Sequence, residues 1–482
     1  MHLKKLPFYI YFSSLCIVLL YLIFSKSLTG DENGTVAIVN NFTYMEIFQE
    51  KYLGDFNPFG FYLLNKIFVY IFGENHEVYK AIPVLFYTLS IVLMYKVAYI
   101  LSNDKEFSLI NAVVFSLLPL NLFYALFDRP YSLLSLVSLS LLYLTLSLYK
   151  DNNNRTKFFY VITLSVGMYF HFFVGLFTAT LFFVGLFFKE LRDKKFMTTI
   201  FILNITALIL FIPELLSFMS KASDVTSIVQ EHAKLGYIYK LAFVSYGVLF
   251  GMTLAPVSQI LILIIAIVMV GLALSVYVNK DMCTDKVNLF SLLFIAISLC
   301  LISLTGFARP MYVIFVTPFV SFIIVKLLYQ NKIKLFTYLL LGIFVFANYN
   351  FIASNSKYFI IPHDTIDYKY YYGDFLASKI DGNTLVVIAP SYNKINFEIY
   401  SNYQLNKVLF INPFIDIQEQ LTFNESKYSK ILVFQEFQNN DIFKNMNKKL
   451  NKFISSDLVD KKHRSFIKNT QYSYFKIVEY KR

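Results

Sequence analysis

Apolar runs of about 20 residues recur along most of this 482-residue chain, and each is long enough to cross the hydrocarbon core of a bilayer. Hydrophobic residues make up 57% of the sequence and charged residues only 15%, whereas a soluble protein typically carries about 25% charged residues. Isolated runs of this length cannot be strands of a membrane barrel, so the spanning segments must be helices. The sequence therefore predicts a polytopic α-helical membrane protein.

About eleven transmembrane helices are expected, of which the fifth and sixth are short. Their residues are 7–25, 81–101, 107–127, 131–149, 158–170, 173–188, 196–218, 257–278, 288–306, 310–329 and 335–353. Lys and Arg gather in every second connection between them. These basic connections are residues 102–106, 150–157, 189–195, 279–287 and 330–334. Because cytoplasmic loops are enriched in Lys and Arg, the pattern predicts a cytoplasmic N-terminus.

The formal net charge of +12 lies mainly in these connections. Such a distribution orients helices in a bilayer, so the charge indicates the membrane as partner and no nucleic acid. The three cysteines, Cys16, Cys283 and Cys300, are scattered along the chain and give neither a disulfide framework nor the spacing of a zinc site.

Residues 28–80 are expected to form a long outer loop. Within it, 44–53 and 61–72 have helical apolar spacing interrupted by Lys and Glu, which is typical of helices that lie in the membrane interface. Residues 219–240 are expected as a second, polar outer loop.

The composition becomes that of a soluble domain after residue 353. Strands are expected at 384–390, 407–412, 430–437 and 474–480, with helices at 393–404 and 440–453. The sequence therefore predicts two domains: a transmembrane domain, 1–353, and a small extracytoplasmic α/β domain, 354–482.

Polar residues near the ends of the expected helices all fall on the outer face under this topology. They are Asp31, Glu32, Asn57, Asp128, Arg129, His171 and Arg309. Ionisable residues at membrane depth are costly and usually indicate function. Each one taken singly has a simpler explanation: solvated acids in a loop, arginines that reach lipid headgroups, or a packed histidine.

Five short motifs occur in order along residues 1–330. They are "GDENG" (Asp31 and Glu32), "NPFGFYLL" (from Asn57), "FDRPY" (Asp128, Arg129 and Tyr131), "YFHFF" (His171) and "ARPMYVIFVTP" (Arg309, Tyr312 and Pro318).

The order and spacing of these motifs resemble the GT-C superfamily of integral-membrane glycosyltransferases. Within it, the nearest branch is that of the protein O-mannosyltransferases and the lipid A aminoarabinose transferase. Two positions depart from the family pattern. The acid that usually stands two residues before the arginine is Phe127 here, with Asp128 displaced by one, and a His-Pro-Pro element is reduced to Asn57-Pro58.

The resemblance implies transfer of a sugar from a polyprenyl-phosphate carrier to an acceptor at the outer face of the plasma (inner) membrane. It assigns the general base to Asp31, with Glu32 as orienter or second acid, and the binding of the donor phosphate to Arg129 and Arg309. The resemblance also assigns substrate contacts to five residues: Asn57, Asp128, Tyr131, His171 and Tyr312. No cofactor or metal ligand is indicated, a divalent metal ion is left open, and the acceptor can be a glycan, a lipid or a protein.

Three other functions compete with this one. A ligase or polymerase of lipid-linked glycans would use the same fold. A transporter or flippase would require internal repeats and charges in the middle of spans, whereas the spans here are nearly free of charge. A non-catalytic scaffold gives no reason for the outer polar residues to meet.

Overall fold

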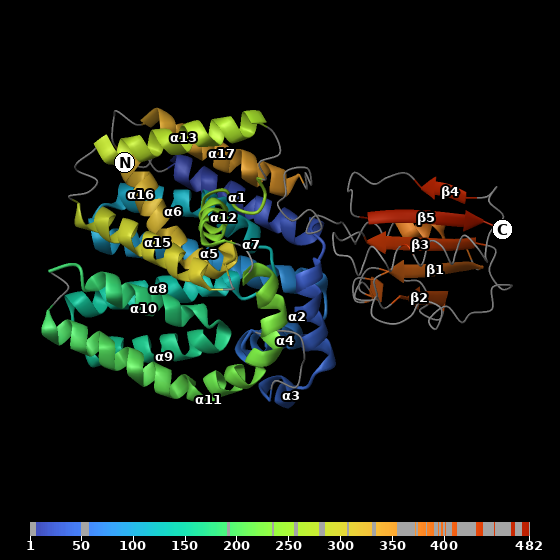
Figure 1. Ribbon diagram of the computed structural model, residues 1–482, viewed down its shortest axis with the longest axis horizontal. Helices are drawn as coiled ribbons and strands as arrows, with labels where there is room; N and C mark the ends of the chain where they lie inside the picture. Colours follow the sequence, from blue (N-terminus) through green and yellow to red (C-terminus); the bar gives the residue numbers. More distant parts are fainter. Residues whose placement is uncertain are drawn as a thin grey trace. The chain divides into compact units, whose positions relative to one another are not determined.

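The computed structural model describes most of the first 353 residues and the strands of the C-terminal region. The described ranges are 6–49, 57–189, 193–233, 236–254, 259–278, 285–305, 308–329 and 334–353, followed by 375–381, 383–389, 407–411, 430–436, 464–467, 475–481 and a few single positions. The chain forms two compact units (Figure 1). One consists of Met1–Phe24 and Ile38–Ala353, and the other of Ser25–Ala37 and Ser354–Arg482.

The first unit is a bundle of helices. Its members are α1 (Leu6–Ser25), α3 (Tyr44–Phe48), α4 (Phe59–Phe72), α5 (His76–Ser102), α6 (Lys105–Leu117), α7 (Pro119–Tyr124), α8 (Tyr131–Lys150), α9 (Asn154–Phe170), α10 (Phe173–Gly185), α11 (Lys194–Ala233), α12 (Tyr237–Phe250), α13 (Gln259–Val278), α15 (Lys286–Leu304), the 3-10 helix η2 (Pro310–Val316), α16 (Thr317–Leu328) and α17 (Lys334–Ile352). Helix α2 (Gly30–Asn41) begins in the second unit and ends in the first.

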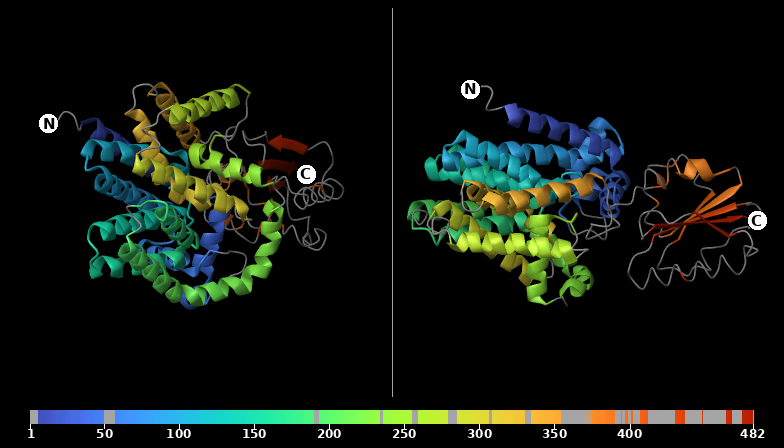
Figure 2. Two further views of the ribbon diagram at one scale, coloured as in Figure 1. Left: turned by 60° about the vertical axis from the view of Figure 1, so that its left-hand side comes forward. Right: turned by 90° about the horizontal axis from the view of Figure 1, so that it is seen from above.

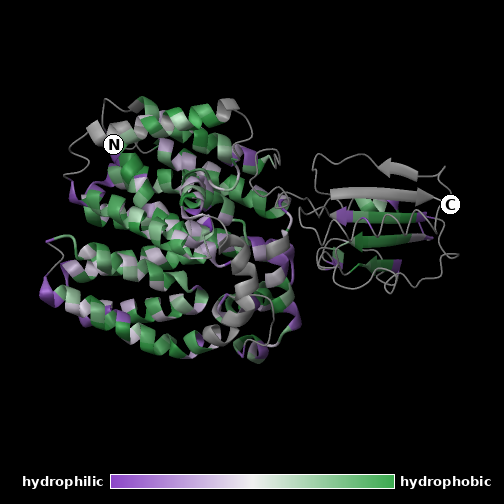
Figure 3. Ribbon diagram, viewed as in Figure 1, coloured by the Kyte–Doolittle hydropathy of each residue, from purple (hydrophilic) through white to green (hydrophobic). Residues whose placement is uncertain are grey.

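Seven of the described helical stretches are long and apolar enough to cross a membrane. They are α1, α5, α8, the first part of α11 (Lys194–Ser217), α15, η2 with α16 (Pro310–Leu328) and most of α17 (Leu335–Ile352). The shorter helices α6 with α7, α9 and α10, together with the 20-residue α13, occupy the other expected spans. Hydrophilic residues gather at the helix ends in Figure 3. The predicted polytopic helical fold is therefore confirmed.

The span expected at 107–127 is broken in the middle. Leu118 has extended backbone angles (φ −58°, ψ 121°) and is followed by Pro119, the first residue of α7. Proline lacks a backbone N–H and disfavours the helical conformation in the residue before it, so α6 ends where α7 begins.

The helices are buried to very different extents. In the apolar stretch of Pro310–Leu328, 78% of the residues are buried, so this segment is central in the bundle. In α1 only 17% are buried, so most of this helix is left for contact with lipid. Helix α1 lies at the edge of the bundle in both views of Figure 2. Aromatic side chains fill the centre, where the rings of Phe294 and Phe319 stack with centroids 4.1 Å apart and Phe177 packs edge-on against Phe315.

The two expected outer loops contain more helix than the sequence predicted. Helices α3 and α4 match the two amphipathic segments, and α2 adds a helix at the start of the expected loop. The polar segment 219–240 is not a loop, because α11 continues to Ala233 and α12 starts at Tyr237. Residues 214–233 contain neither glycine nor proline, so nothing in them stops the helix.

The second unit contains a five-stranded sheet in the order β2-β1-β3-β5-β4. Its strands are β1 (Thr384–Ala389), β2 (Val408–Phe410), β3 (Lys430–Glu436), β4 (Arg464–Ile467) and β5 (Phe475–Lys481). Strand β1 pairs in parallel with β2 and β3, and β5 is antiparallel to both β3 and β4.

Strand β1 is buried along its whole length, as a strand in the middle of a covered parallel sheet should be. Helix α18 (Leu376–Lys379) and the ring of Tyr372 pack with Val386, Ile388 and Phe434 in the core of this unit. The four predicted strands are confirmed and β4 was not predicted. Helices were also expected at 393–404 and 440–453, but most of these residues lie outside the part of the chain that the structure describes.

Candidate active site

Three of the residues expected to bind substrate form one aromatic cluster in the first unit. The ring centroids of Tyr131, His171 and Tyr312 are 5.8 to 6.1 Å from one another. Phe173 completes the cluster by stacking on Tyr312 at 4.9 Å. Each member lies at or near a helix end. Tyr131 begins α8, Tyr312 lies in η2, Phe173 begins α10, and His171 lies in the junction before α10. Segments more than a hundred residues apart therefore meet at one end of the bundle.

His171 is buried and is held by a local hydrogen bond. It follows α9 with an extended backbone (φ −159°, ψ 126°), and its side chain is 2% exposed. Its Nδ1 accepts a hydrogen bond from the backbone N–H of Phe173 at 3.2 Å. An Nδ1 that accepts a hydrogen bond corresponds to the ring tautomer with its N–H at Nε2. That tautomer offers a hydrogen-bond donor at Nε2.

Arg129 is fixed by the short connection between α7 and α8. The guanidinium Nη1 of this half-buried residue donates to the hydroxyl of Tyr62, on α4, at 3.3 Å. Its neighbour Asp128 is fully buried. The hydroxyl of Ser132 donates to the carbonyl of Tyr124 at 2.7 Å and closes the connection. The sequence did not indicate Tyr62, because a tyrosine in an apolar helix resembles any packed aromatic residue.

A buried lysine lies against the same connection. The Nζ of Lys80, 2% exposed on α5, donates to the carbonyl of Leu126 at 2.9 Å. The neighbouring Tyr79 donates from its hydroxyl to Asn40 at 2.7 Å. Sequence reasoning missed Lys80, although a lysine one turn inside a long apolar helix was the available signal. Burying a cation is costly, so this lysine is a candidate for binding an anion.

A second pair of cations flanks the segment before η2. Arg309 is half-buried and directly precedes Pro310, the first residue of η2. Lys240, 8% exposed on α12, donates from Nζ to the carbonyl of Thr305 at 3.3 Å. Lys240 was also missed by the sequence, because it fell at the end of the segment expected to be a polar loop.

Asp31 and Glu32 lie in the first turn of α2. The carboxylate of Glu32 is fully buried and accepts a hydrogen bond from the backbone N–H of Thr29 at 2.7 Å, while Asn33 N–H donates to the carbonyl of Thr29. A glutamate that reaches back three residues in this way satisfies a donor at the start of the helix. The side chain of Asp31 lies outside the described residues.

The outer loop expected around these acids opens with a helix. On a helix, successive positions differ by about 100° around the axis, not by the half-turn of a strand. The other end of α2 is capped in the first unit, where the Nζ of Lys66 donates to the carbonyl of Val39 at 2.5 Å. A cation at this end is favoured by the helix dipole.

Asn57 is half-buried and precedes Pro58, at the start of α4. It therefore directly precedes the helix that carries Tyr62, the partner of Arg129. Among the residues that the structure describes, no group of three or more His, Cys, Asp or Glu side chains could hold a metal ion.

Two solved structures share this fold along nearly the whole chain. ArnT from Cupriavidus metallidurans bound to undecaprenyl phosphate superposes with a TM-score of 0.53 and 11% identity, over 98% of this chain and 98% of that one. The same protein in the apo state gives 0.52 and 10%, over 99% and 98%. The fold that the resemblance implies is confirmed.

Residues 56–216 also match the family model of the dolichyl-phosphate-mannose-protein mannosyltransferases. This match covers about a third of the chain and contains the "FDRPY" and "YFHFF" motifs. No curated protein sequence matches significantly. The chain is a multi-pass membrane protein similar in fold to a glycosyltransferase.

Substitution of Gly247 should test how η2 is held. A Cβ added there would lie 2.1 Å from Cγ of Pro310, next to Arg309, so α12 and η2 must move apart. Gly247→Ala is expected to destabilise the protein by about 1–3 kcal/mol, although alanine is normally the better helix residue. The measurement is the melting temperature in detergent.

Gly236→Ala is the matched control, because Gly236 precedes the same helix and nothing lies within 4 Å of an added Cβ. Its melting temperature should stay near that of the wild type. Equal melting temperatures of the two variants would show that the α12–η2 contact does not fix this segment.

Proposed function

We propose that the protein transfers a sugar from a polyprenyl-phosphate carrier to an acceptor at the outer face of the plasma membrane. The observation that carries the proposal is the cluster of Tyr131, His171 and Tyr312, with Arg129 and Arg309 two and three residues before its tyrosines. Aromatic rings offer a surface for a sugar, and guanidinium groups offer paired donors to a phosphate.

The chemistry needs a base and a site for a leaving phosphate. The acceptor hydroxyl oxygen attacks the anomeric carbon, its proton passes to the carboxylate of Asp31, and the bond from that carbon to the phosphate oxygen breaks. The electron pair stays on the phosphate, where Arg129 and Arg309 stabilise the added negative charge. His171 adds a donor at Nε2.

The hydrogen bond made by Glu32 supports different roles for Asp31 and Glu32. Its buried carboxylate accepts the Thr29 N–H, so it stabilises the first turn of the helix that carries Asp31. We therefore assign the base to Asp31 and the orienting role to Glu32. Asn57 and Asp128 are proposed substrate-side residues because they flank the α4 and α7–α8 elements that position Arg129.

The reaction is tested with purified protein and a panel of polyprenyl-phosphate sugars, with the mass of the product as readout. Asp31→Asn, which is nearly isosteric, should lower the transfer rate by about 10²–10⁴-fold while donor binding and melting temperature stay near wild type. Glu32→Gln should lower the rate by less than about tenfold, because its amide oxygen can still accept the Thr29 N–H. A near-normal transfer rate of Asp31→Asn would contradict the assignment of Asp31 as the general base.

Both the charge of Arg309 and the ability of its guanidinium group to form two parallel hydrogen bonds are expected to contribute to donor binding. Arg309→Ala is expected to weaken donor binding by about 10–100-fold, the range for a lost charged hydrogen bond. Arg309→Lys should recover only part of this, because an ammonium cannot bind a phosphate in a bidentate manner. Arg155→Ala, an exposed arginine in the expected basic loop 150–157, is the control. Unchanged affinity of Arg309→Ala would leave the residue as a lipid-headgroup anchor only.

The proposed topology has a cytoplasmic N-terminus and an extracytoplasmic domain after residue 353. It rests on the basic connections, in which Lys and Arg concentrate. Reporter fusions at 153 should report the cytoplasm, and fusions at 129 and 420 the outside. A cytoplasmic signal at 420 would reverse the face to which the transfer reaction is assigned.

A further inference from the structure

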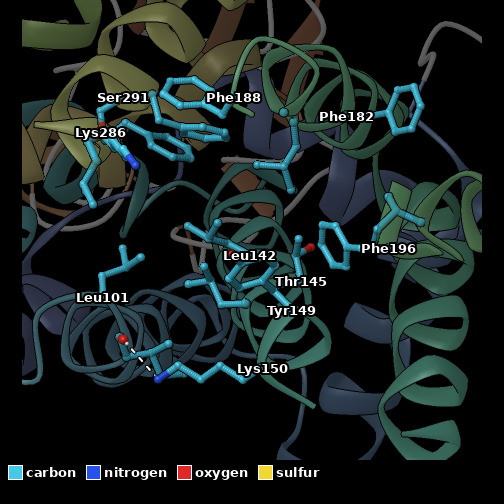
Figure 4. A pocket seen from close by; sticks show the side chains of 18 of the residues that line it. Leu101, Leu142, Thr145, Tyr149, Lys150, Phe182, Phe188, Phe196, Lys286 and Ser291 are labelled. Carbon is cyan, nitrogen blue, oxygen red and sulfur yellow. Dashed lines mark hydrogen bonds between the residues drawn. The ribbon is translucent and has the colours of Figure 1, made fainter. Parts of the chain in front are cut away.

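An apolar cavity of about 390 Å³ lies inside the first unit (Figure 4). Its walls come from six helices: the last turns of α5, α8 and α10, the first turns of α11 and α15, and the middle of α16. The volume falls within the range of about 300–1,000 Å³ that is common for small-molecule sites. The wall is made mainly of leucine, phenylalanine and other hydrocarbon side chains, such as Leu142 and Phe196.

The cavity lies at the opposite end of the bundle from the candidate active site. Helix α8 begins at Tyr131, in the aromatic cluster, and ends at Lys150, in the cavity wall. Twenty helical residues span about 30 Å, the thickness of the hydrocarbon core. The cavity is thus at the depth of the other leaflet, about the length of α8 away from the candidate active site.

The charged residues in the described lining of this cavity are lysines. Lys150 and Lys286 belong to the lining, which includes no carboxylate among the residues the structure describes. Both lysines are exposed, and in Figure 4 they lie on either side of Leu101. Lys150 donates from Nζ to the carbonyl of Ile100 at 3.3 Å, which keeps its ammonium at this edge of the cavity.

A smaller neighbouring cavity of about 270 Å³ has a different charge pattern. Its lining includes Asp104 and Asp285, which would repel a phosphate, and Lys326, which already bonds Asp285 at 2.8 Å. Partial burial would raise the pKa of Asp285, but hydrogen bonds from Lys326 and from the N–H groups of Asn288 and Val287 outweigh it and lower the pKa. This second cavity is therefore not suited to an anionic headgroup.

We propose that the larger cavity binds an anionic phospholipid of the inner leaflet, with an acyl chain among the apolar side chains and the phosphate at the edge that carries Lys150 and Lys286. Basic pockets between transmembrane helices on the cytoplasmic side recognise anionic headgroups, and the inner leaflet supplies them. The leaflet follows from the proposed topology, whereas the binding itself is independent of the transfer reaction.

The occupant is an ordinary phospholipid rather than the polyprenyl-phosphate donor. A donor bound at the active site has its phosphate at the far end of α8, about 30 Å from this edge. One headgroup cannot occupy both places, so we assign the headgroup at this edge to a lipid other than the bound donor.

The absence of tryptophan from the sequence allows a direct test. A single reporter, Phe196→Trp, places an indole in the cavity wall of the full-length protein in nanodiscs of phosphatidylcholine. Phosphatidylglycerol with brominated chains should quench its fluorescence at about a tenfold lower mole fraction than brominated phosphatidylcholine, as expected for two lysines near a phosphate. Phe290→Trp, on α15 in the lining of the same cavity, is a second reporter if the first variant does not fold.

The double variant Lys150→Gln, Lys286→Gln should reduce the preference for phosphatidylglycerol to about twofold or less. The matched control is Lys105→Gln, Lys157→Gln, which removes the same charge from the expected basic loops outside the cavity lining and should keep the preference.

Three results would overturn the proposal. They are equal quenching by the two phospholipids, a preference that survives loss of Lys150 and Lys286, and displacement of phosphatidylglycerol by undecaprenyl phosphate at a lower mole fraction than by unlabelled phosphatidylglycerol. Sugar transfer is not part of the readout, so failure here leaves the proposed activity standing, and loss of the activity leaves the lipid site standing.

Discussion

In a bilayer every backbone N–H and C=O group must be bonded within the chain, because no water reaches it. Regular helices satisfy this requirement, and irregular backbone is confined to their ends. The aromatic cluster follows from this constraint: Tyr131 starts α8 after Pro130, His171 follows the end of α9, and Tyr312 lies in the 3-10 turn that starts with Pro310. The helix ends therefore bring side chains from several helices to one place.

The cations of the site follow from the same constraint. Lys80 and Lys240 each donate to a backbone carbonyl in a helix-end segment, Leu126 in one case and Thr305 in the other. The carbonyls left over at helix ends thus partly compensate the buried ammonium groups. Two such segments, each with a lysine and an arginine, lie beside one ring cluster. The arrangement suits a ligand that has both a negative charge and a polar ring.

Hydropathy predicted the spans and strands well because both are decided by local pattern and burial. It also identified Arg129, His171 and Arg309, since polar residues at helix ends stand out in an apolar sequence. Tyr62, Lys80 and Lys240 were missed because their importance lies in a contact with a distant segment, which no local pattern reveals. The helical backbone of α2 was missed because "GDENG" has the composition of a turn, and the bond from Glu32 to Thr29 is what favours the helix.

The second unit is built from two segments that lie far apart in the sequence, and this has a consequence for biosynthesis. Its residues Ser25–Ala37 carry the acidic pair, yet they are separated from Ser354–Arg482 by roughly 300 residues of chain. At about 5–20 residues per second, translation of that interval takes tens of seconds. The early segment therefore completes its packing only after residues of the Ser354–Arg482 segment have left the ribosome. The two acids are among the first residues to be made, whereas the rest of their unit is made last.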